Sequence, residues 1–261
     1  MGLLKELRKP FAGAHARRVA AQLARALDGL GERVPVLVVA YNNGTHVRGM
    51  VAQLHARGLP AIVIDNASTD PATRTLLDEL ERGGSARVVR GSGNLGHMVG
   101  FQQAVWDVLP RRFCYTDPDI RFDPAMPADF LDTLSSLQER FDVFKVGLAL
   151  SLDAAALDES LRARVRSHRP VRLAMDVGIR DWESRFWRQR LACEGLEVYA
   201  APVDTTFALY DKTRYRGSFT DAVRVAGPYA AVHLPWFPDL DPMREAERQR
   251  YGQGNVCNTW R

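Results

Sequence analysis

A repeated alternation of short apolar runs with amphipathic segments constrains the fold of this chain more than any other feature of its sequence. Short runs typical of strands stand at 34–40, 61–64, 87–90 and 113–116, and the first two are apolar and rich in β-branched residues. Runs of this length and composition are typical of strands that are buried on both faces of a parallel sheet. Because helical spacing of apolar residues appears between the runs, the sequence predicts an open α/β sheet with short connections.

The expected elements extend along the whole chain. The first half predicts helices over 14–30, 45–57, 71–82 and 96–108. The second half predicts, in order, a helix over 129–140, a strand over 143–150, a solvated helix or mobile loop region over 154–166, a helix over 181–194 and strands over 198–201 and 205–210. Turn residues and aromatic residues dominate from Phe219 onward. We expect one continuous domain over 34–261 with a mostly parallel, Rossmann-like sheet flanked by helices, preceded by a basic helical segment over 1–33.

The charge of the chain is concentrated at its start. Residues 1–33 hold seven Lys and Arg residues and three acidic residues, so this segment carries the whole formal net charge of +4. The remaining residues sum to zero, which argues against a general nucleic-acid-binding surface. An apolar content of 46% argues equally against a disordered chain.

Cysteine usage and hydropathy bear on location. Cys114, Cys193 and Cys257 are far apart and form no CxxC pair, so neither a zinc site nor a disulfide framework is indicated. No apolar run approaches the length of a membrane span, and the basic start is not followed by the apolar region of a secretory signal. We therefore expect a cytoplasmic protein, with peripheral contact to the inner membrane face as an option.

The segment that would make this membrane contact is the amphipathic helix over 14–30. Its apolar face is formed by Ala16, Val19, Ala20, Leu23, Leu27 and Leu30. One interpretation is a helix packed on the domain. The other is a basic interfacial helix on anionic lipid, although an alanine-rich apolar face would bind lipid weakly.

Polar clusters follow the expected strands, where ligands sit in open α/β sheets. Asp117 and Asp119 flank a proline after the fourth strand, and two carboxylates at this spacing suit a hard divalent cation with diphosphate oxygens completing its shell. Alone, such a triplet also fits a turn with one solvated and one capping acid.

Asp65 and Asn66 follow the second strand and could bind a base edge or a ribose, or serve only as turn residues. Ser68, Thr69 and Asp70 could cap the next helix.

Four segments, in this order and spacing, resemble family 2 glycosyltransferases with the GT-A fold. They are VLVVAYNN at 36–43, IVIDNASTD at 62–70, GNLG at 93–96 and TDPDI at 116–120. The resemblance covers roughly residues 34–137 and is thin after that. It implies transfer of a sugar from a nucleotide diphosphate donor with inversion, using Mn²⁺ or Mg²⁺. It divides the domain into a nucleotide-sugar-binding half over 34–125 and an acceptor half over 126–261.

The resemblance also implies roles for individual residues. Ala40, Tyr41 and Asn42 would border the base, and Asp65 would bind a uracil-type edge with Asn66 beside it. Arg90 and Asn94 would lie near the donor sugar or the diphosphate. Asp117 would contact the ribose, or the metal through water, and Asp119 would bind the metal directly. His233 would be a further metal ligand, since an imidazole beside two carboxylates suits Mn²⁺. His97 departs from the family pattern and either faces the donor or caps a helix.

The resemblance also points to a general base late in the chain. The family places an acid at the start of a helix, before an Arg-Leu pair and a glycine, which correspond here to Arg190, Leu191 and Gly195. Counting back from them makes Glu183 the first choice as base and Asp181 the second. The alternative is that both acids only favour a helix N-terminus through its dipole.

The expected partners are a UDP-type sugar donor and an acceptor that the resemblance suggests is a bacterial surface polysaccharide or a lipid-linked oligosaccharide. Two other classes stay open from the sequence. A nucleotidyltransferase also uses an α/β sheet, two acids and a metal, but the turn at 41–44 lacks a basic, glycine-rich phosphate loop. A non-catalytic carbohydrate- or partner-binding domain could keep the fold without the reaction.

Overall fold

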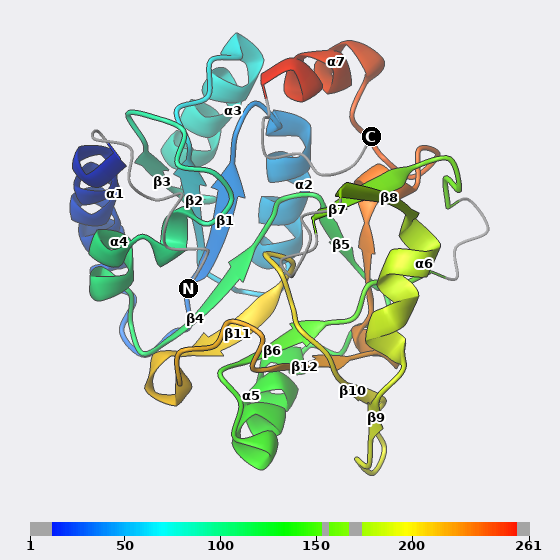
Figure 1. Cartoon of the computed structure of the whole chain (residues 1–261). Helices are drawn as coiled ribbons and strands as arrows, with labels where there is room; N and C mark the ends of the chain where they lie inside the picture. Colours follow the sequence, from blue (N-terminus) through cyan, green and yellow to red (C-terminus); the bar gives the residue numbers. More distant parts are fainter. Residues whose placement is uncertain (1–11, 153–156, 167–173, 255–261) are drawn as a thin grey trace.

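The four runs form adjacent strands on one side of a nine-stranded sheet in the computed structural model of the chain, which describes residues 12–152, 157–166 and 174–254 (Figure 1). The strand order is β3-β2-β1-β4-β11-β6-β12-β10-β9. Only β11 and β10 oppose the direction shared by the other strands, as the pairings require. The mostly parallel α/β sheet predicted from the sequence is therefore confirmed. Its strands are β1 Val36–Ala40, β2 Ala61–Asp65, β3 Arg87–Arg90, β4 Arg112–Thr116, β6 Lys145–Leu148, β9 Arg190–Leu191, β10 Val198–Ala200, β11 Ala208–Asp211 and β12 Ala222–Val225.

Helices cover both faces of this sheet (Figure 1). The helices of the described chain are α1 Ala12–Leu27, α2 Gly44–His55, α3 Pro71–Arg82, α4 Gln103–Val108, α5 Phe130–Phe141, α6 Ile179–Glu183 and α7 Glu245–Gly254, of which α1 to α5 provide this cover. Alternate residues of β1 face opposite cores: Val36 and Val38 pack with side chains of α2, α3 and α5, whereas Leu37 and Val39 pack with side chains of α1 and α4. This two-sided burial explains why the central strands read as continuous apolar runs rather than alternating patterns.

Two small antiparallel pairs lie outside the main sheet. One joins β5 Ile120–Phe122 to β13 Ala231–His233, and the other joins β7 Arg162–Arg166 to β8 Ala174–Gly178. The second pair corrects the prediction of a solvated helix or loop over 154–166, of which residues 154–156 lie outside the described residues. The strands β5, β12 and β13 and the helix α7 were not predicted.

Two expected helices are shorter in the structure. The helix expected over 181–194 ends at Trp187 after a 3₁₀ turn, because Arg190 and Leu191 pair with β10 instead. The helix expected over 96–108 becomes a 3₁₀ turn over Val99–Phe101 followed by α4, with Gln102 extended between them. Gly100 in this turn lies directly against the Tyr115 ring, since a Cβ there would lie 2.3 Å from it.

The N-terminal helix α1 is an integral part of the domain. Its apolar residues Val19 and Leu23 are fully buried in the core beneath β3 and α4. Its Gln22 side chain donates to the carbonyl of Arg90 and accepts from the amide of Arg90 (2.8 and 3.0 Å). These two hydrogen bonds pair the free backbone groups of the edge strand β3 in the way that a further strand would. The packed-helix interpretation therefore holds for the apolar face. Membrane contact stays a prediction for the exposed basic face of α1 and for residues 1–11, which lie outside the described residues.

Replacement of Leu23 by alanine tests this packing. We expect Leu23→Ala to lower the free energy of unfolding by about 2–5 kcal/mol, because it leaves a cavity beside β3. The matched control is Arg18→Ala on the exposed face of the same helix, which should change the value by less than about 0.5 kcal/mol. Denaturant titration of the two variants measures both effects. Equal stability of the Leu23 variant and the wild type would show that α1 is only tethered to the domain.

Candidate functional site

The predicted site residues gather at the edge of the sheet where the parallel strands end. Ala40 at the end of β1 is paired with Asp65 at the end of β2, and β4 ends beside β1 at Thr116. The polar segments after these three strands therefore meet at one edge, as the strand–helix alternation predicts. The amide of Asn66 donates to the carbonyl of Ala40 (2.8 Å), which joins the first two segments directly.

A polar pocket of about 290 Å³ opens beside the end of β2. It is lined by Asp65, Ala67, Ser68, Arg74, Asp78, Arg90 and Gly91. Asp65 is almost fully buried, and its Oδ1 accepts from the amide of Ser68 (2.9 Å). The predicted turn role of Asp65 is thus real, and the same carboxylate also lines the pocket. Arg90, half-buried, forms an ion pair with Asp78 of α3 (2.5 Å), so its guanidinium lies at this pocket rather than at Asp117.

Asn42 and Asn66 act mainly on the backbone around them. Asn42 has a positive φ of 51°, and its Oδ1 accepts from the amides of Thr69 and Asp70 (2.7 and 2.9 Å). Asn66 donates to the carbonyl of Gly96 (2.9 Å) and so holds the loop after β3. Asp70 caps α3 by accepting from the amide of Thr73 (2.8 Å), which confirms the predicted cap.

The other expected donor contacts lie at the rim of this edge. Tyr41 is half-buried, and its amide donates to Oδ1 of Asn43 (3.0 Å). Asn94 and His97 are exposed. Asn94 accepts from the amide of Gly96, and the backbone carbonyl of His97 accepts from the Tyr115 hydroxyl (2.8 and 2.5 Å). The backbone of His97 is therefore fixed while its imidazole is accessible.

The carboxylate of Asp119 faces the imidazole of His233. β5 begins one residue after Asp119, and its pairing with β13 places His233 opposite Ile120. His233 Nε2 lies 3.6 Å from Oδ2 of Asp119, and both side chains are buried. Burial lowers the pKa of His233 even though the charge of Asp119 opposes this shift. The imidazole is therefore neutral at pH 7, which is the form that binds metals.

The residues at this position fit a divalent cation. Oδ1 of Asp119 is buried and has no hydrogen-bond partner within the described part of the chain. Burial, and then the charge of Asp119, raise the pKa of the neighbouring Asp117 well above its usual range, although the Thr205 hydroxyl opposes this shift. A cation between these groups would relieve the repulsion and give Asp119 a partner. Among the described residues, no group of three or more His, Cys, Asp or Glu side chains is arranged to hold a metal, so oxygens from a ligand would have to complete its shell.

A second buried histidine lies near this pair and was not predicted. His46, on α2, is hydrogen-bonded through Nε2 to Asp241 (2.7 Å), and both side chains are 2% exposed. Burial lowers the pKa of His46, but the bond to Asp241 and the charge of Asp119 outweigh it and raise the pKa overall. The two partners are 195 residues apart, so no local sequence signal links them.

The two candidate bases differ in their environment. Glu183 is 2% exposed and forms an ion pair with Arg224, which is 4% exposed. Burial raises the pKa of Glu183 to about 7 against the opposing effect of Arg224, and burial lowers the pKa of Arg224. Asp181 is exposed on the same helix. The burial of Glu183 thus argues against its contact with an acceptor, whereas Asp181 is accessible.

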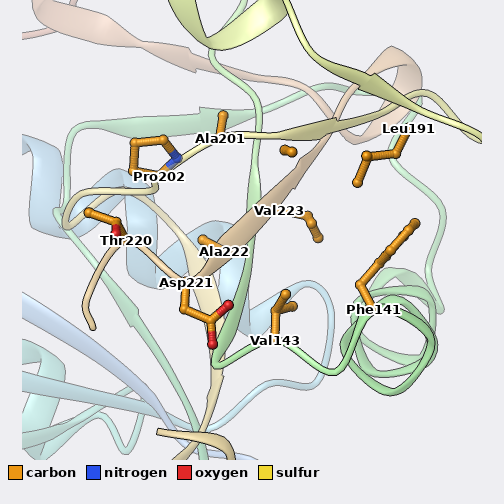
Figure 2. Close-up of a pocket in the computed structure, with 10 residues that line it drawn as sticks. Phe141, Val143, Leu191, Ala201, Pro202, Thr220, Asp221, Ala222 and Val223 are labelled. Atoms are coloured by element: carbon orange, nitrogen blue, oxygen red, sulfur yellow. The ribbon is translucent and has the colours of Figure 1, made fainter. Parts of the chain in front are cut away.

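A larger hollow, of about 520 Å³, lies away from these residues (Figure 2). Apolar side chains line most of it, including Phe141, Leu191 and Val223, with Asp221 at its floor. Val143 and Ala222 lie at or before the starts of β6 and β12, which point in the same direction as β4. The hollow is therefore at the opposite end of the sheet from Asp117 and Asp119.

No described helix is long and apolar enough to cross a bilayer.

Comparisons with known proteins give partial structural likeness. No family model and no curated protein sequence matches the chain. Among solved structures, the mannosyltransferase PcManGT from Pyrobaculum calidifontis, in complex with GDP-Man and Mn²⁺, is 17% identical and gives a TM-score of 0.43. The match covers 78% of this chain and 54% of that one. Residues 1–349 of TarS from S. aureus are 13% identical, with a TM-score of 0.36 and coverage of 51% and 42%. This chain spans about half of the length of either neighbour, and likeness at this level carries no information on what it binds.

The buried pair of Glu183 and Arg224 makes stability depend on pH. The pKa of Glu183 is about 7 in the folded protein against an ordinary value of 4.5, so the folded state holds this proton more tightly. Its contribution to stability is complete below pH 4.5 and is lost as the pH rises through 7. We expect the wild type to lose stability relative to Glu183→Gln when the pH is raised over this range, because glutamine does not titrate. Denaturant titrations at several pH values test this, and parallel curves for the two proteins would contradict it.

Proposed function

We propose that this chain is a metal-dependent glycosyltransferase that moves a sugar from a nucleotide diphosphate donor to a hydroxyl acceptor with inversion. One observation carries this proposal. A buried carboxylate oxygen of Asp119, which has no hydrogen-bond partner among the residues that the structure describes, stands beside His233 at the edge where β1, β2 and β4 end. A polar pocket that contains Asp65 opens at the same edge. A cation position and a base-sized polar pocket are the two parts that a nucleotide sugar requires.

The donor base would lie against the ends of β1 and β2. The Asp65 carboxylate can accept from an N–H on a base edge, while Ala40, Tyr41 and Asn42 form the adjoining backbone. A UDP-sugar is the donor that the family resemblance suggests, and guanine offers comparable N–H donors. Asn66 fixes the loop that carries Asn94 and His97. In this proposal both residues would lie near the diphosphate or the donor sugar.

Asp119 and His233 would bind Mn²⁺ or Mg²⁺ directly, and Asp117 would bind it through water or contact the ribose. When bound, the cation supplies positive charge that neutralises the nucleoside diphosphate as it leaves. The chain itself contributes a buried site in which carboxylate and imidazole are already held in place. Such preorganisation costs no rearrangement when charge develops on the leaving group.

The general base in this proposal is Asp181. Inversion requires one proton acceptor on the side of the sugar opposite the leaving group, and an accessible carboxylate is sufficient for that role. Glu183 is the last residue of α6, and its ion pair with Arg224 instead holds it in the interior. The acceptor is a saccharide or a lipid-linked saccharide, and the exposed basic residues of α1 and residues 1–11 are the part that would bring the protein to a lipid surface.

Release of nucleoside diphosphate from sugar nucleotides tests the proposal. A panel that includes UDP-sugars and GDP-mannose, incubated with Mn²⁺, should show hydrolysis by the wild type. We expect Asp119→Asn to lower this rate by about a hundredfold or more, because charge stabilisation by a bound cation is worth several kcal/mol. Asp132→Ala, an exposed acid on α5, is the matched control and should retain the rate. No release across the whole panel, or an active Asp119 variant, would refute the enzyme.

The base is tested separately by two amide substitutions on α6. We expect Asp181→Asn to lower hydrolysis by roughly 10²–10⁴-fold, the usual contribution of a general base, while Mn²⁺ binding stays at the wild-type level. Glu183→Gln should have a much smaller effect. The reverse result, an active Asp181 variant and an inactive Glu183 variant that still folds, would assign the base to the buried residue.

A further inference from the structure

One segment of backbone crosses the face of the sheet to reach the candidate site. We call residues 201–207 the crossing segment. The chain leaves β10 at Ala200 and enters β11 at Ala208, yet β12 and β6 lie between these two strands in the sheet. The crossing segment therefore passes over β12 and β6. It starts at the end of the sheet that holds the larger hollow and finishes beside Asp117, at the opposite end.

Two buried cations hold this segment by consecutive carbonyl oxygens. Arg224 Nε donates to the carbonyl of Pro202 (2.8 Å), and Lys145 Nζ donates to the carbonyl of Val203. The side chain of Lys145 also lies over the rings of Tyr210 and Phe219, and burial lowers its pKa to about 8. A buried cation is costly unless it has partners. Arg224 is paired with Glu183 and Lys145 lies over two rings, and each also donates to one of these two carbonyl oxygens.

The segment also lies directly on the sheet. A Cβ at Gly147 would be 2.7 Å from both methyl groups of Val203 and 3.2 Å from the carbonyl of Phe207. Gly147 is opposite Arg224 in the pairing of β6 with β12, so the close approach and the arginine contact occur at the same level of the sheet. Neither end of the segment can shift without disturbing these contacts.

The far end of the segment holds Asp117 in two ways. The Thr205 hydroxyl donates to Oδ2 of Asp117 (2.6 Å), and the Asp117 amide donates to the carbonyl of Thr205 (2.8 Å). The backbone and the carboxylate of Asp117 are thus both fixed by one residue that is 88 positions later in the chain. The next residue, Thr206, is buried as well, but its hydroxyl has no partner within the described residues.

We propose that Thr205 is a positioning residue for Asp117, and that Lys145 and Arg224 set its place through the crossing segment. This inference rests on the proposed function, since it gives Thr205 a role in cation binding. Because Arg224 also pairs with Glu183, the same contacts connect α6, which carries Asp181, to the carboxylates at the end of β4. The carboxylate that assists cation binding and the helix that carries the proposed base are then held by one set of buried charges.

The test measures Mn²⁺ binding by electron paramagnetic resonance of the free ion, in the presence of UDP or GDP, together with the thermal midpoint of each variant. We expect Thr205→Val to weaken Mn²⁺ binding by about 10–100-fold, the range usual for groups that orient metal-binding side chains. Thr205→Ser, which keeps the hydroxyl, should restore most of the affinity. Thr206→Val is the matched control and should bind Mn²⁺ as the wild type does.

A remote variant separates positioning from stability. Lys145→Met keeps the volume of the side chain and removes its contact with Val203. Lys145 pairs with Tyr210, which pairs with Phe113 of β4, so the change lies at the level of a residue four positions before Asp117. We expect it to weaken Mn²⁺ binding in the same direction while the thermal midpoint is unchanged or higher, because a buried charge is removed. A lower midpoint with unchanged Mn²⁺ binding would show a purely structural role and overturn the inference.

The failures of the two proposals are distinguishable. A wild-type protein that binds no Mn²⁺ with either nucleotide, and releases no nucleoside diphosphate, overturns the proposed function and the inference with it. A wild type that binds Mn²⁺ while Thr205→Val binds it equally well overturns only the role of Thr205. Equal weakening by Thr205→Val and Thr205→Ser would also overturn it, since the hydroxyl would then be irrelevant.

Discussion

The pairing of β5 with β13 is the interaction on which the candidate site depends. The three central parallel strands bring Ala40, Asp65 and Thr116 to one edge, but they supply no histidine. The chain turns into β5 directly after Asp119, and the antiparallel register with β13 delivers His233 from the far end of the sequence. The amide of Leu234 then donates to the carbonyl of Asp119 (2.9 Å), which closes the pair beyond the last strand residue. A shift of this register by one residue would turn the imidazole to the other face of the strand.

Several charged side chains around the site are buried, and most of them have a partner among the described residues. Asp241 is held by His46 and Arg248, and Glu183 by Arg224. Lys145 uses a backbone carbonyl. Asp119 differs, because one of its carboxylate oxygens is buried without a partner among the described residues. Burial of a charge without compensation costs several kcal/mol, so this oxygen is the strongest local indication of a cation.

Much of the first half could be predicted from the sequence, since local patterns determine it. The run at 61–64 and the helix over 71–82 match β2 and α3 closely, because burial of β2 on both faces and a proline at the first helical turn leave few alternatives. The run at 87–90 also matches β3. The strand β12 was missed because Arg224 interrupts its apolar pattern, and it is buried only through partners on α6 and the crossing segment. The contacts of Asp117 with Thr205 and of His46 with Asp241 have no local signature, because they join residues that only the folded sheet brings together. The nearness of Asp119 and His233 was expected from the family resemblance and not from spacing.

The helix α7 shows how far this dependence on distant partners extends. Its described contacts with the sheet edge are polar: Glu247 accepts from the amide and the hydroxyl of Thr45 at the start of α2, and Arg250 pairs with Asp70 at the start of α3. Both helices follow the strands whose ends form the polar pocket, and a carboxylate at the start of α2 also complements its dipole. The last described helix of the chain therefore steadies the turns at 41–44 and 66–70, which are the two turns that the proposed donor base would touch (Figure 1). In this molecule the edge that carries the candidate site is formed by the ends of the first strands and completed by C-terminal segments, so its contacts join both ends of the described chain.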